Sequence, residues 1–472
     1  MSSKTDMVPV RPFRFVDLFA GIGGFHAALS ALGGDCVYAV EIDREAAAVY
    51  ERNWGTCALG DLVVDTAGEE IRVPEHDVLA AGFPCQPFSK SGLQRGMDEA
   101  RGTLFWNILR VLEVHRPSVV MLENVRNIAG PRHTHEWEVI IRSLRELGYQ
   151  VSSAPVVLSP HLLPPALGGS PQVRERVFIL GVYVGTDASF VDVEPQVSRR
   201  PDPAWDPQSW HLATDLPLES HMAPEELMQL RLSAQENHWL DAWDDFVRSM
   251  RADGVARLPG FPVWADEFVH VDELCIPAGT PAWKAGFLRK NAELYTAHRE
   301  AIQAWLARWD QLRDFPASRR KFEWQAQDAA SLSETIIHLR PSGVRVKKAT
   351  YTPALVAITQ TTILGDQRRR LSKREVARLQ GFPDSFTFGP QRASASYRQA
   401  GNGVNVGVAY NALRSFVHRI AASSEVLEFM STEALRKFQP VARSLEDAPP
   451  RPWFDDDPRS AGEQSLLSTA RA

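Results

Sequence analysis

Residues 77–89, DVLAAGFPCQPFS, join an apolar run to a proline-rich turn, and this join decides the fold. The run Val78 to Ala81 is typical of a buried parallel strand, because Gly82 and Pro84 end the ladder directly after it. In open α/β sheets, ligands bind at the carboxyl edge of the strands. Cys85 lies at that predicted edge and is our candidate nucleophile, although a free cysteine is more often a small buried hydrophobic residue.

The stretch upstream predicts a strand, a glycine loop and a helix. RFVDLF (residues 14–19) is the strand, AGIGG (20–24) the loop, and FHAALSALGG the helix. Glycines at such a turn let the backbone approach a ligand closely. A GxGxxG fingerprint would need glycine in place of His26, so the loop is a poor pyrophosphate site and a plain structural turn remains an alternative.

Acidic residues end the next two predicted strands. CVYAVEID (36–43) precedes a helical pattern, and its Glu41 follows the glycine loop by about the 20 residues typical of a carboxylate that holds ribose hydroxyls. A helix N-cap or a solvated carboxylate is the alternative. ALGD (58–61) is a further short strand candidate that ends in Asp61.

Downstream of Cys85, QPFSKSGLQRGMDEARGT (86–103) has the length and composition of a lid or binding loop. A helix, LFWNILRVLEVH, then leads to PSVVMLENV, a strand that delivers Glu123 and Asn124. PQVRER (171–176) precedes another strand, where Arg174 and Arg176 are candidates for anion or base contacts or, alternatively, for a surface ion network.

From about residue 186 to 345 the βα alternation disappears, which indicates an inserted or second domain. KNAELYTAHREAIQAWLARWDQL (290–312) is predicted to be helical. Basic clusters near aromatic residues favour either a nucleic-acid surface or solvated faces; they are Arg319–Lys321, Arg345 with Lys347 and Lys348, and Arg368–Arg370 with Lys373 and Arg374.

The chain beyond residue 372 is predicted to return to the first sheet. SKREVARLQG (372–381) is a helix with a capping box from Ser372 to Glu375. The stretch 396–418 supplies a second glycine turn and a long amphipathic helix. The tail rich in Pro, Asp and Ser from about residue 440 predicts disorder.

Composition sets the class of protein. The chain has 472 residues, of which 44% are hydrophobic, and a formal charge of -6. This net charge does not exclude binding to nucleic acid, because local basic clusters decide phosphate contact more than the total charge does. The four cysteines form no CxxC pair, so neither a zinc site nor a disulfide framework is predicted. Without a signal-peptide or membrane-spanning pattern, we expect an intracellular protein.

These motifs together resemble, in kind and order, those of the bacterial-type cytosine-5 DNA methyltransferases. DLFAGIGG resembles the family's cofactor motif, GFPCQPFS its nucleophile motif, ENV its glutamate motif and QVRER its arginine motif. RLSKREVARLQGFPD and GNGVNV resemble its last two motifs. GGSPQ and GNG depart slightly from the commoner forms. The resemblance implies an α/β fold with a Rossmann-like methyltransferase sheet and a second, smaller target-recognition domain.

The resemblance also implies the chemistry. Cys85 would add to carbon 6 of cytosine so that carbon 5 becomes nucleophilic, and Glu123 would bind ring nitrogen 3 and the exocyclic amine. Arg174 and Arg176 would steady the base and its phosphate. The base would be flipped out of duplex DNA beneath the loop; the loop residues that this implies are Gln86, Ser89 and Ser91.

S-adenosylmethionine would be the methyl donor, with S-adenosylhomocysteine as product and no metal. The implied cofactor-binding residues are Phe19, Gly21, Gly23, Gly24, Glu41, Ile42, Asp61, Leu62, Pro84, Leu104 and Asn402. The implied domains are a catalytic domain (1–185), a target-recognition domain (186–394), a return segment (395–438) and a disordered tail (439–472).

We expect a cytoplasmic, monomeric enzyme that acts on duplex DNA beside the nucleoid, with a cognate restriction endonuclease as a partner and no membrane contact. Two alternatives remain: a tRNA cytosine-5 methyltransferase of the same fold, and a non-catalytic DNA-binding relative. The length of the region 186–345 argues against the first, and the presence of Cys85 and Glu123 argues against the second.

Overall fold

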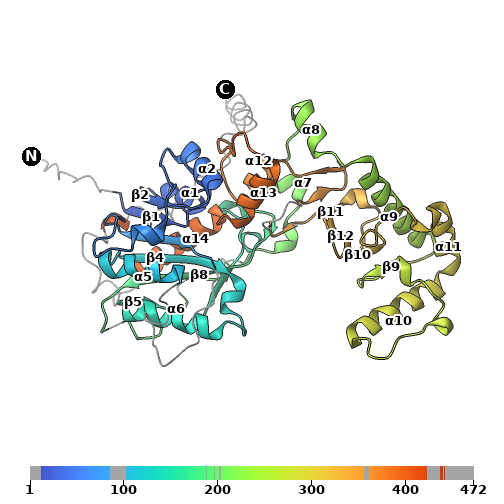
Figure 1. The fold of residues 1–472 in the computed structure, drawn as a ribbon, viewed down its shortest axis with the longest axis horizontal. Helices are drawn as coiled ribbons and strands as arrows, with labels where there is room; N and C mark the ends of the chain where they lie inside the picture. Colours follow the sequence, from blue (N-terminus) through green and yellow to red (C-terminus); the bar gives the residue numbers. More distant parts are fainter. Residues whose placement is uncertain are drawn as a thin grey trace, which may run out of the picture.

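The structure, a computed structural model, describes residues 12–84, 103–187, 189–195, 197–200, 204–355, 361–422, 436–438 and 441. It has two lobes (Figure 1), one built on a seven-stranded sheet and the other on a six-stranded sheet. The predicted α/β class with a second, smaller domain is confirmed.

The helices are α1 (Gly24–Ala31), α2 (Arg44–Trp54), α3 (Leu62–Asp65), α5 (Leu104–His115), α6 (Thr134–Glu146), α7 (Leu212–Asp215), α8 (Pro224–Leu230), α9 (Ala234–Ala252), α10 (Ala282–Ala297), α11 (Arg299–Arg308), α12 (Lys373–Leu379), α13 (Ala393–Asn402) and α14 (Val406–Ala422). The strands are β1 (Arg14–Leu18), β2 (Asp35–Val40), β3 (Val78–Gly82), β4 (Val119–Val125), β5 (Tyr149–Val151), β6 (Val156–Leu158), β7 (Gln172–Val173), β8 (Arg176–Tyr183), β9 (Val263–Trp264), β10 (Lys321–Gln325), β11 (Thr335–Arg340), β12 (Gly343–Lys348), β13 (Thr352–Pro353), β14 (Ile363–Leu364) and β15 (Arg369–Arg370).

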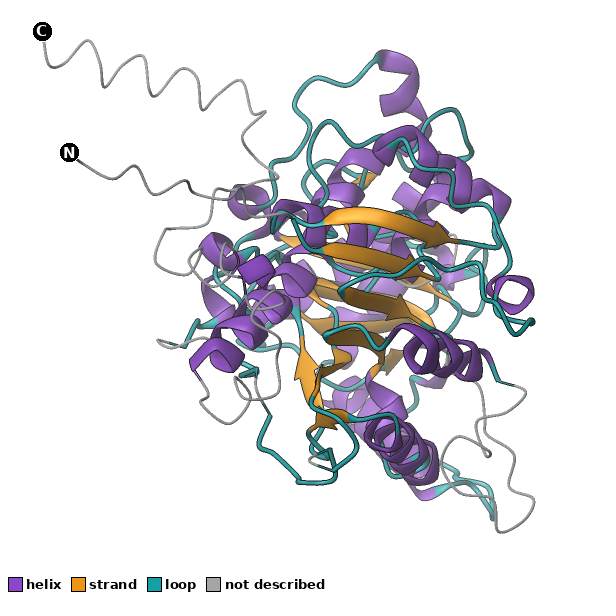
Figure 2. Ribbon diagram, turned by 90° about the vertical axis from the view of Figure 1, so that its left-hand side faces the viewer, coloured by secondary structure: helices purple, strands orange, loops and turns teal. Residues whose placement is uncertain are grey.

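The first sheet has the strand order β2-β1-β3-β4-β8-β5, with β6 also paired to β8. The four strands β2, β1, β3 and β4 are parallel, and β8 is antiparallel to its neighbours. Helices cover both faces (Figure 2), which is why β3 and β4 are apolar without alternation. The carboxyl ends of β1, β3 and β4 therefore meet at one edge, as the strand-ending Gly82 and Pro84 predict.

The two faces of this sheet are packed by different parts of the chain. Helices α5 and α6 contribute to the core on one face, whereas α1 and α14 contribute to the core on the other. Helix α14 lies against α1 and β8, so the predicted return of the chain to the first sheet is confirmed. The core on the α14 side also includes Leu371, Val376 and Phe382 of the segment that precedes it.

The second lobe has a sheet of order β15-β14-β11-β12-β10-β9. Side chains alternate along its strands: Phe322, Trp324, Val344 and Val346 lie in a core with residues of α9 and α11. The opposite face carries polar side chains, among them Arg340 and Lys347. A short parallel pair, β13 with β7, joins the lobes.

One local prediction is wrong: the stretch 58–61 forms only an isolated bridge, from Leu59 to Glu41, rather than a strand. The helical prediction for 290–312 is confirmed over most of its length. The stretch divides at His298 into α10 and α11, and the turn after α11 places Asp310 and Gln311 at positive φ. The predicted disordered tail, 439–472, lies outside the described residues except for Val441, which is buried.

Candidate functional site

A cavity of about 440 Å³ opens at the carboxyl edge of the first sheet. It contains residues from the ends of β1, β2, β3 and β4, from the start of β8, and from the end of α13. Its lining is Phe19, Gly21, Val40, Glu41, Ile42, Gly60, Asp61, Leu62, Gly82, Phe83, Pro84, Leu104, Glu123, Asn124, Val125, Arg176, Gly401 and Asn402. Most of the residues predicted to form the site therefore lie together, although the chain separates Phe19 from Asn402 by most of its length.

The glycine loop is held in a left-handed conformation that few side chains tolerate. Phe19, Gly21 and Gly23 have φ of 57°, 54° and 90°. Gly23 and Gly24 do not line the cavity: a Cβ at Gly23 would lie 2.0 Å from Nε1 of Trp54, and one at Gly24 would lie 2.4 Å from the carbonyl oxygen of Val404. These two glycines are therefore required for packing behind the loop.

Trp54, at the end of α2, binds this loop from behind. Its Nε1 donates to the carbonyl oxygen of Ile22 at 3.1 Å, and its ring stacks on His26 with centroids 4.9 Å apart. His26 Nδ1 lies 2.6 Å from the hydroxyl of Tyr50, also on α2. Burial lowers the pKa of His26 to about 4, so this ring is neutral at physiological pH.

Glu41 and Asp61 each combine a backbone contact with a position on the cavity. Glu41 Oε2 accepts from the amide of Gly21 at 2.8 Å and its Oε1 from the amide of Asp43 at 2.7 Å. Asp43, rather than Glu41, is the N-cap of α2. Asp61 is the N-cap of α3 and accepts from the amide of Val63 at 2.9 Å. Both carboxylates are thus fixed in orientation before any ligand binds.

Glu123 is the buried acid of the site. Only 7% of it is exposed, and its Oε1 lies 3.1 Å from Nε of Arg176. Burial raises the pKa of Glu123, while the charges of Arg174 and Arg176 lower it; burial is the larger effect. At a given pH, a larger fraction of Glu123 is therefore protonated than of an exposed glutamate.

Arg174 lies behind the cavity rather than on it. Its guanidinium donates to the carbonyl oxygens of Leu355 (3.3 Å), Gly401 (3.0 Å) and Gly403 (2.6 Å). Burial, followed by the charge of Arg176, lowers the pKa of Arg174 to about 9. The side chain thus joins the start of β8 to the segment that carries Asn402 into the cavity.

Asn124, predicted with Glu123 at the end of one strand but without a role, also lines the cavity. Its Nδ2 donates to the carbonyl oxygen of Phe83 at 2.9 Å, and its Oδ1 accepts from the amide of Val125 at 2.8 Å. Phe83 and Pro84 are the last residues described before the candidate nucleophile. Cys85, Gln86, Ser89 and Ser91 themselves lie outside the described residues.

Most of the predicted basic clusters are neutralised by acids from elsewhere in the chain. Arg369 is 1% exposed and forms a 2.8 Å ion pair with the fully buried Glu375, so it cannot contact a phosphate. The other pairs are Arg320 with Asp266, Arg345 with Glu323, Lys348 with Asp328, Arg368 with Asp241, Arg370 with Glu236, and Arg374 with Glu219 and Asp384. The prediction of a phosphate-binding surface from these clusters is therefore wrong for Arg369.

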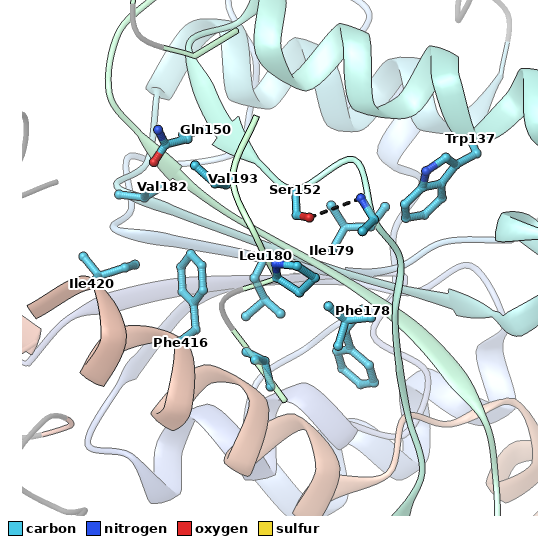
Figure 3. A pocket seen from close by; sticks show the side chains of 14 residues that line it. Trp137, Gln150, Ser152, Phe178, Ile179, Leu180, Val182, Val193, Phe416 and Ile420 are labelled. Atoms are coloured by element: carbon cyan, nitrogen blue, oxygen red, sulfur yellow. Dashed lines mark hydrogen bonds between the residues drawn. The ribbon is translucent and has the colours of Figure 1, made fainter. Parts of the chain in front are cut away.

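A second cavity, of about 110 Å³, lies between β8 and the end of α14 (Figure 3). Apolar side chains such as Phe178, Leu180 and Phe416 dominate its lining, and the only polar side chains are Gln150, Ser152 and the indole of Trp137. None of these residues is ionisable, so the cavity has no general acid or base to activate the hydroxyl of Ser152.

Within the described ranges, no cluster of three or more His, Cys, Asp or Glu side chains is arranged to hold a metal ion. No helix in that same part of the chain combines the length and the apolar character needed to span a membrane.

Sequence comparisons with known proteins agree on one family. Residues 13–418 match the model of the C-5 cytosine-specific DNA methylases. The type II methyltransferase M.AluI of Cellulosimicrobium cellulans is 47% identical over 86% of this chain and 92% of its own length. M.HhaI of Haemophilus parahaemolyticus is 42% identical over 35% of this chain and 48% of its own. A solved putative DNA modification methyltransferase of an E. coli prophage covers 87% of this chain and 100% of its own at 19% identity, with a TM-score of 0.44.

Proposed function

The chain belongs to the C-5 cytosine-specific DNA methylase family, and we propose that it methylates carbon 5 of a flipped-out cytosine through Cys85 and Glu123, with S-adenosylmethionine as the donor. The observation that carries the proposal is the cavity itself, because it places the buried acid Glu123 beside a glycine loop and two fixed carboxylates.

The charged lining of the cavity supports the binding of S-adenosylmethionine. Glu41 and Asp61 use part of their carboxylates on backbone amides and retain lone pairs for ribose hydroxyls and an adenine amine. Ile42 is 72% exposed at the cavity wall, where an adenine ring would cover it. When bound, this donor supplies an electrophilic methyl group on a positively charged sulfur, which the acidic lining favours.

Glu123 acts as the acid in this scheme. Because burial raises its pKa, its carboxyl can donate a proton to ring nitrogen 3 of cytosine while its other oxygen accepts from the exocyclic amine. Arg176, 3.1 Å away, fixes the orientation of the carboxyl. Asn124 holds the carbonyl of Phe83 and so constrains the chain that leads to Cys85.

The covalent step uses the thiolate of Cys85. Its sulfur forms a bond to carbon 6 of cytosine, the carbon 5–carbon 6 double bond opens toward carbon 5, and nitrogen 3 takes its proton from Glu123. Carbon 5 would then take the methyl group as the methyl–sulfur bond of the donor breaks, with its electron pair left on the sulfur of S-adenosylhomocysteine. A base removes the proton from carbon 5, the double bond between carbons 5 and 6 re-forms, Cys85 leaves as the thiolate, and nitrogen 3 returns its proton to Glu123.

For the DNA surface, we propose the polar face of the second sheet. Helices α9 and α11 lie on the side of this sheet away from the first lobe (Figure 1), so the polar face is turned toward the first lobe. It carries Arg340 and Lys347. Burial, and then the charge of Arg345, lowers the pKa of both side chains, and the nearby carboxylate of Glu323, which is paired with Arg345, offsets this only in part. A bound phosphate would stabilise their charged forms.

The packing also suggests where this recognition domain ends. Residues 371–388 share the core of α1 and α14, so we propose that the recognition domain stops near residue 370 rather than at 394.

The first experiment is conversion sequencing for 5-methylcytosine on plasmid DNA from a host without its own cytosine methylation. We expect methylation at one short motif with the natural chain and none with Cys85→Ala or Glu123→Ala. A Trp305→Phe variant, altered in the second lobe, serves as a matched control that still methylates. Methylation of tRNA in preference to duplex DNA would contradict the proposal, as would the absence of a covalent complex with duplexes containing 5-fluorocytosine.

We further propose that the enzyme protects its host against a restriction endonuclease of the same specificity, because its relative M.AluI is a type II methyltransferase. An extract of the source cells is expected to cleave unmethylated plasmid and to spare plasmid methylated by this chain. Cleavage of both plasmids, or of neither, would contradict the proposal of a restriction endonuclease with the same specificity.

A further inference from the structure

One carboxylate beside the cavity binds two arginines from distant parts of the chain. Glu175 Oε2 lies 2.6 Å from Nη1 of Arg126, and its Oε1 lies 3.0 Å from Nη2 of Arg199. The side chains of both arginines are more than half exposed, at 63% and 57%, whereas that of Glu175 is 25% exposed. We call these three residues the rim cluster.

The strand register places the rim cluster directly beside the proposed catalytic residues. Val125 of β4 pairs with Arg176 of β8, and both line the cavity. Arg126 follows Val125 in the chain, and Glu175 precedes Arg176. The cluster therefore lies one residue beyond the cavity wall, at the same carboxyl edge of the sheet. Arg199 joins it from the segment that runs toward the second lobe.

The rim cluster has a net positive charge on a chain whose formal charge is -6, because two guanidinium groups face one carboxylate. Each guanidinium has five N–H donors, and each gives one nitrogen to Glu175. The remaining donors are exposed in a planar fork that matches a phosphate group. An exposed ion pair contributes little to stability, so the stability of the fold does not account for the cluster.

The proposed function explains why phosphates would come to this edge. A cytosine that reaches Glu123 must swing out of the duplex, and its sugar and flanking phosphates then lie at the mouth of the cavity. We propose that Arg126 and Arg199 bind the phosphates of the target strand next to the flipped cytosine, with Glu175 as the residue that positions both. This inference rests on the proposed base flipping, but the contact itself is electrostatic and can be measured without catalysis.

The test is the salt dependence of DNA binding for Arg126→Gln and Arg199→Gln. Fluorescence anisotropy would be measured with a labelled random-sequence 30-base-pair duplex and with the duplex that carries the mapped methylation motif, over a range of KCl concentrations. A plot of the logarithm of the association constant against the logarithm of the salt concentration has a negative slope. Each substitution is expected to make this slope less steep by about 0.9 and to weaken binding to the motif duplex about tenfold. The affinity for S-adenosylhomocysteine is expected to stay unchanged.

Arg308→Gln is the matched control, because Arg308 is a half-exposed arginine paired with Asp245 at 2.9 Å on the helical side of the second lobe. It is expected to leave the slope and the affinity unchanged. Slopes for Arg126→Gln and Arg199→Gln equal to that of the control would overturn the proposal. If either Gln variant fails to fold, the Arg→Lys variant at that position is measured instead. It keeps the positive charge, so its salt slope is expected to equal that of the natural chain. A less steep slope in the Lys variant would count against the phosphate contact.

The Glu175→Gln variant tests whether Glu175 positions the two arginines or only reduces the positive charge of the rim cluster. Removal of the carboxylate raises the net charge of the rim, so binding to the random duplex is expected to tighten. If Glu175 positions the arginines, kcat/KM on the motif duplex falls at the same time. Tighter binding with unchanged kcat/KM would remove the positioning role. Failure of the natural chain to methylate DNA would contradict the proposed function and would leave the salt slopes as an independent result.

Discussion

The indole of Trp54 occupies the space into which a side chain at Gly23 would project, with Nε1 only 2.0 Å from the position of a Cβ. The same nitrogen donates to the carbonyl oxygen of Ile22 inside the glycine loop. One residue of α2 thus explains both the glycine and the conformation of the loop that lines the cavity.

Trp54→Phe keeps a ring in this space but removes the donor for Ile22. We expect the dissociation constant for S-adenosylhomocysteine to rise about fivefold, the equivalent of one hydrogen bond of about 1 kcal/mol, as measured by calorimetry. Trp305→Phe removes a similar bond, from Nε1 to the carbonyl oxygen of Ala242, in the second lobe and should leave the constant unchanged. Equal effects of the two substitutions would show that the loop does not depend on Trp54.

The pH dependence of kcat should report on Glu123. Its raised pKa favours the protonated carboxyl, so the rate is expected to fall as pH rises through that pKa and the proton is lost. Arg176→Gln removes a charge that lowers this pKa, and we expect the alkaline limb to move to higher pH while kcat falls about 100-fold. Arg176→Lys keeps the charge and should keep the limb in place; an unmoved limb in Arg176→Gln would assign it to another group.

Asp17→Asn should stabilise the protein at neutral and alkaline pH. Asp17 is 1% exposed, its Oδ2 accepts from the amide of His26 at 3.2 Å, and burial raises its pKa well above the usual range. Because the folded state then binds more protons than the unfolded state above about pH 3.9, the contribution of Asp17 to stability is lost as pH rises through the folded pKa.

The gain in unfolding free energy for Asp17→Asn is therefore expected to grow with pH, by at most about 1.4 kcal/mol per unit, and to be small near pH 4. Urea unfolding of both proteins at several pH values measures it. A difference that does not change with pH would show that Asp17 is ionised in the folded protein.

Arg369→Ala should destabilise the fold rather than weaken DNA binding. It leaves the carboxylate of Glu375 buried without its cation, which costs about 3–5 kcal/mol. Arg313→Ala breaks an exposed pair with Asp310 and should cost at most about 1 kcal/mol. Urea unfolding distinguishes them, and equal losses of stability would contradict the role of the buried pair.

Local sequence signals predicted the first lobe well. Apolar runs stopped by Gly82, Pro84 and the glycine loop located the parallel strands, because prolines and glycines end a ladder by local geometry. The capping box of Ser372 and Glu375 located α12 for the same reason. The placement of Glu41 and Glu123 on one cavity follows from the shared edge of parallel strands.

Long-range contacts were beyond the reach of those signals. The strands of the second sheet are short and alternate polar with apolar residues, and β10 pairs with β12 across an intervening strand. The acids that neutralise Arg368 and Arg370, Asp241 and Glu236, lie more than 120 residues away, so a basic cluster in the sequence says little about surface charge. Arg174 was expected near the base, but its contacts are carbonyls brought close only by folding.

The cavity is assembled from both ends of the chain, since Gly21 and Asn402 share its wall and α14 covers α1. During synthesis, the ribosome releases the glycine loop almost 400 residues before the segment that completes the pocket. Until then Phe25 and Leu29 have no partner helix, and the growing chain is exposed to aggregation and to chaperones. A nascent fragment that lacks α13 and α14 has no complete cavity, so it cannot modify DNA.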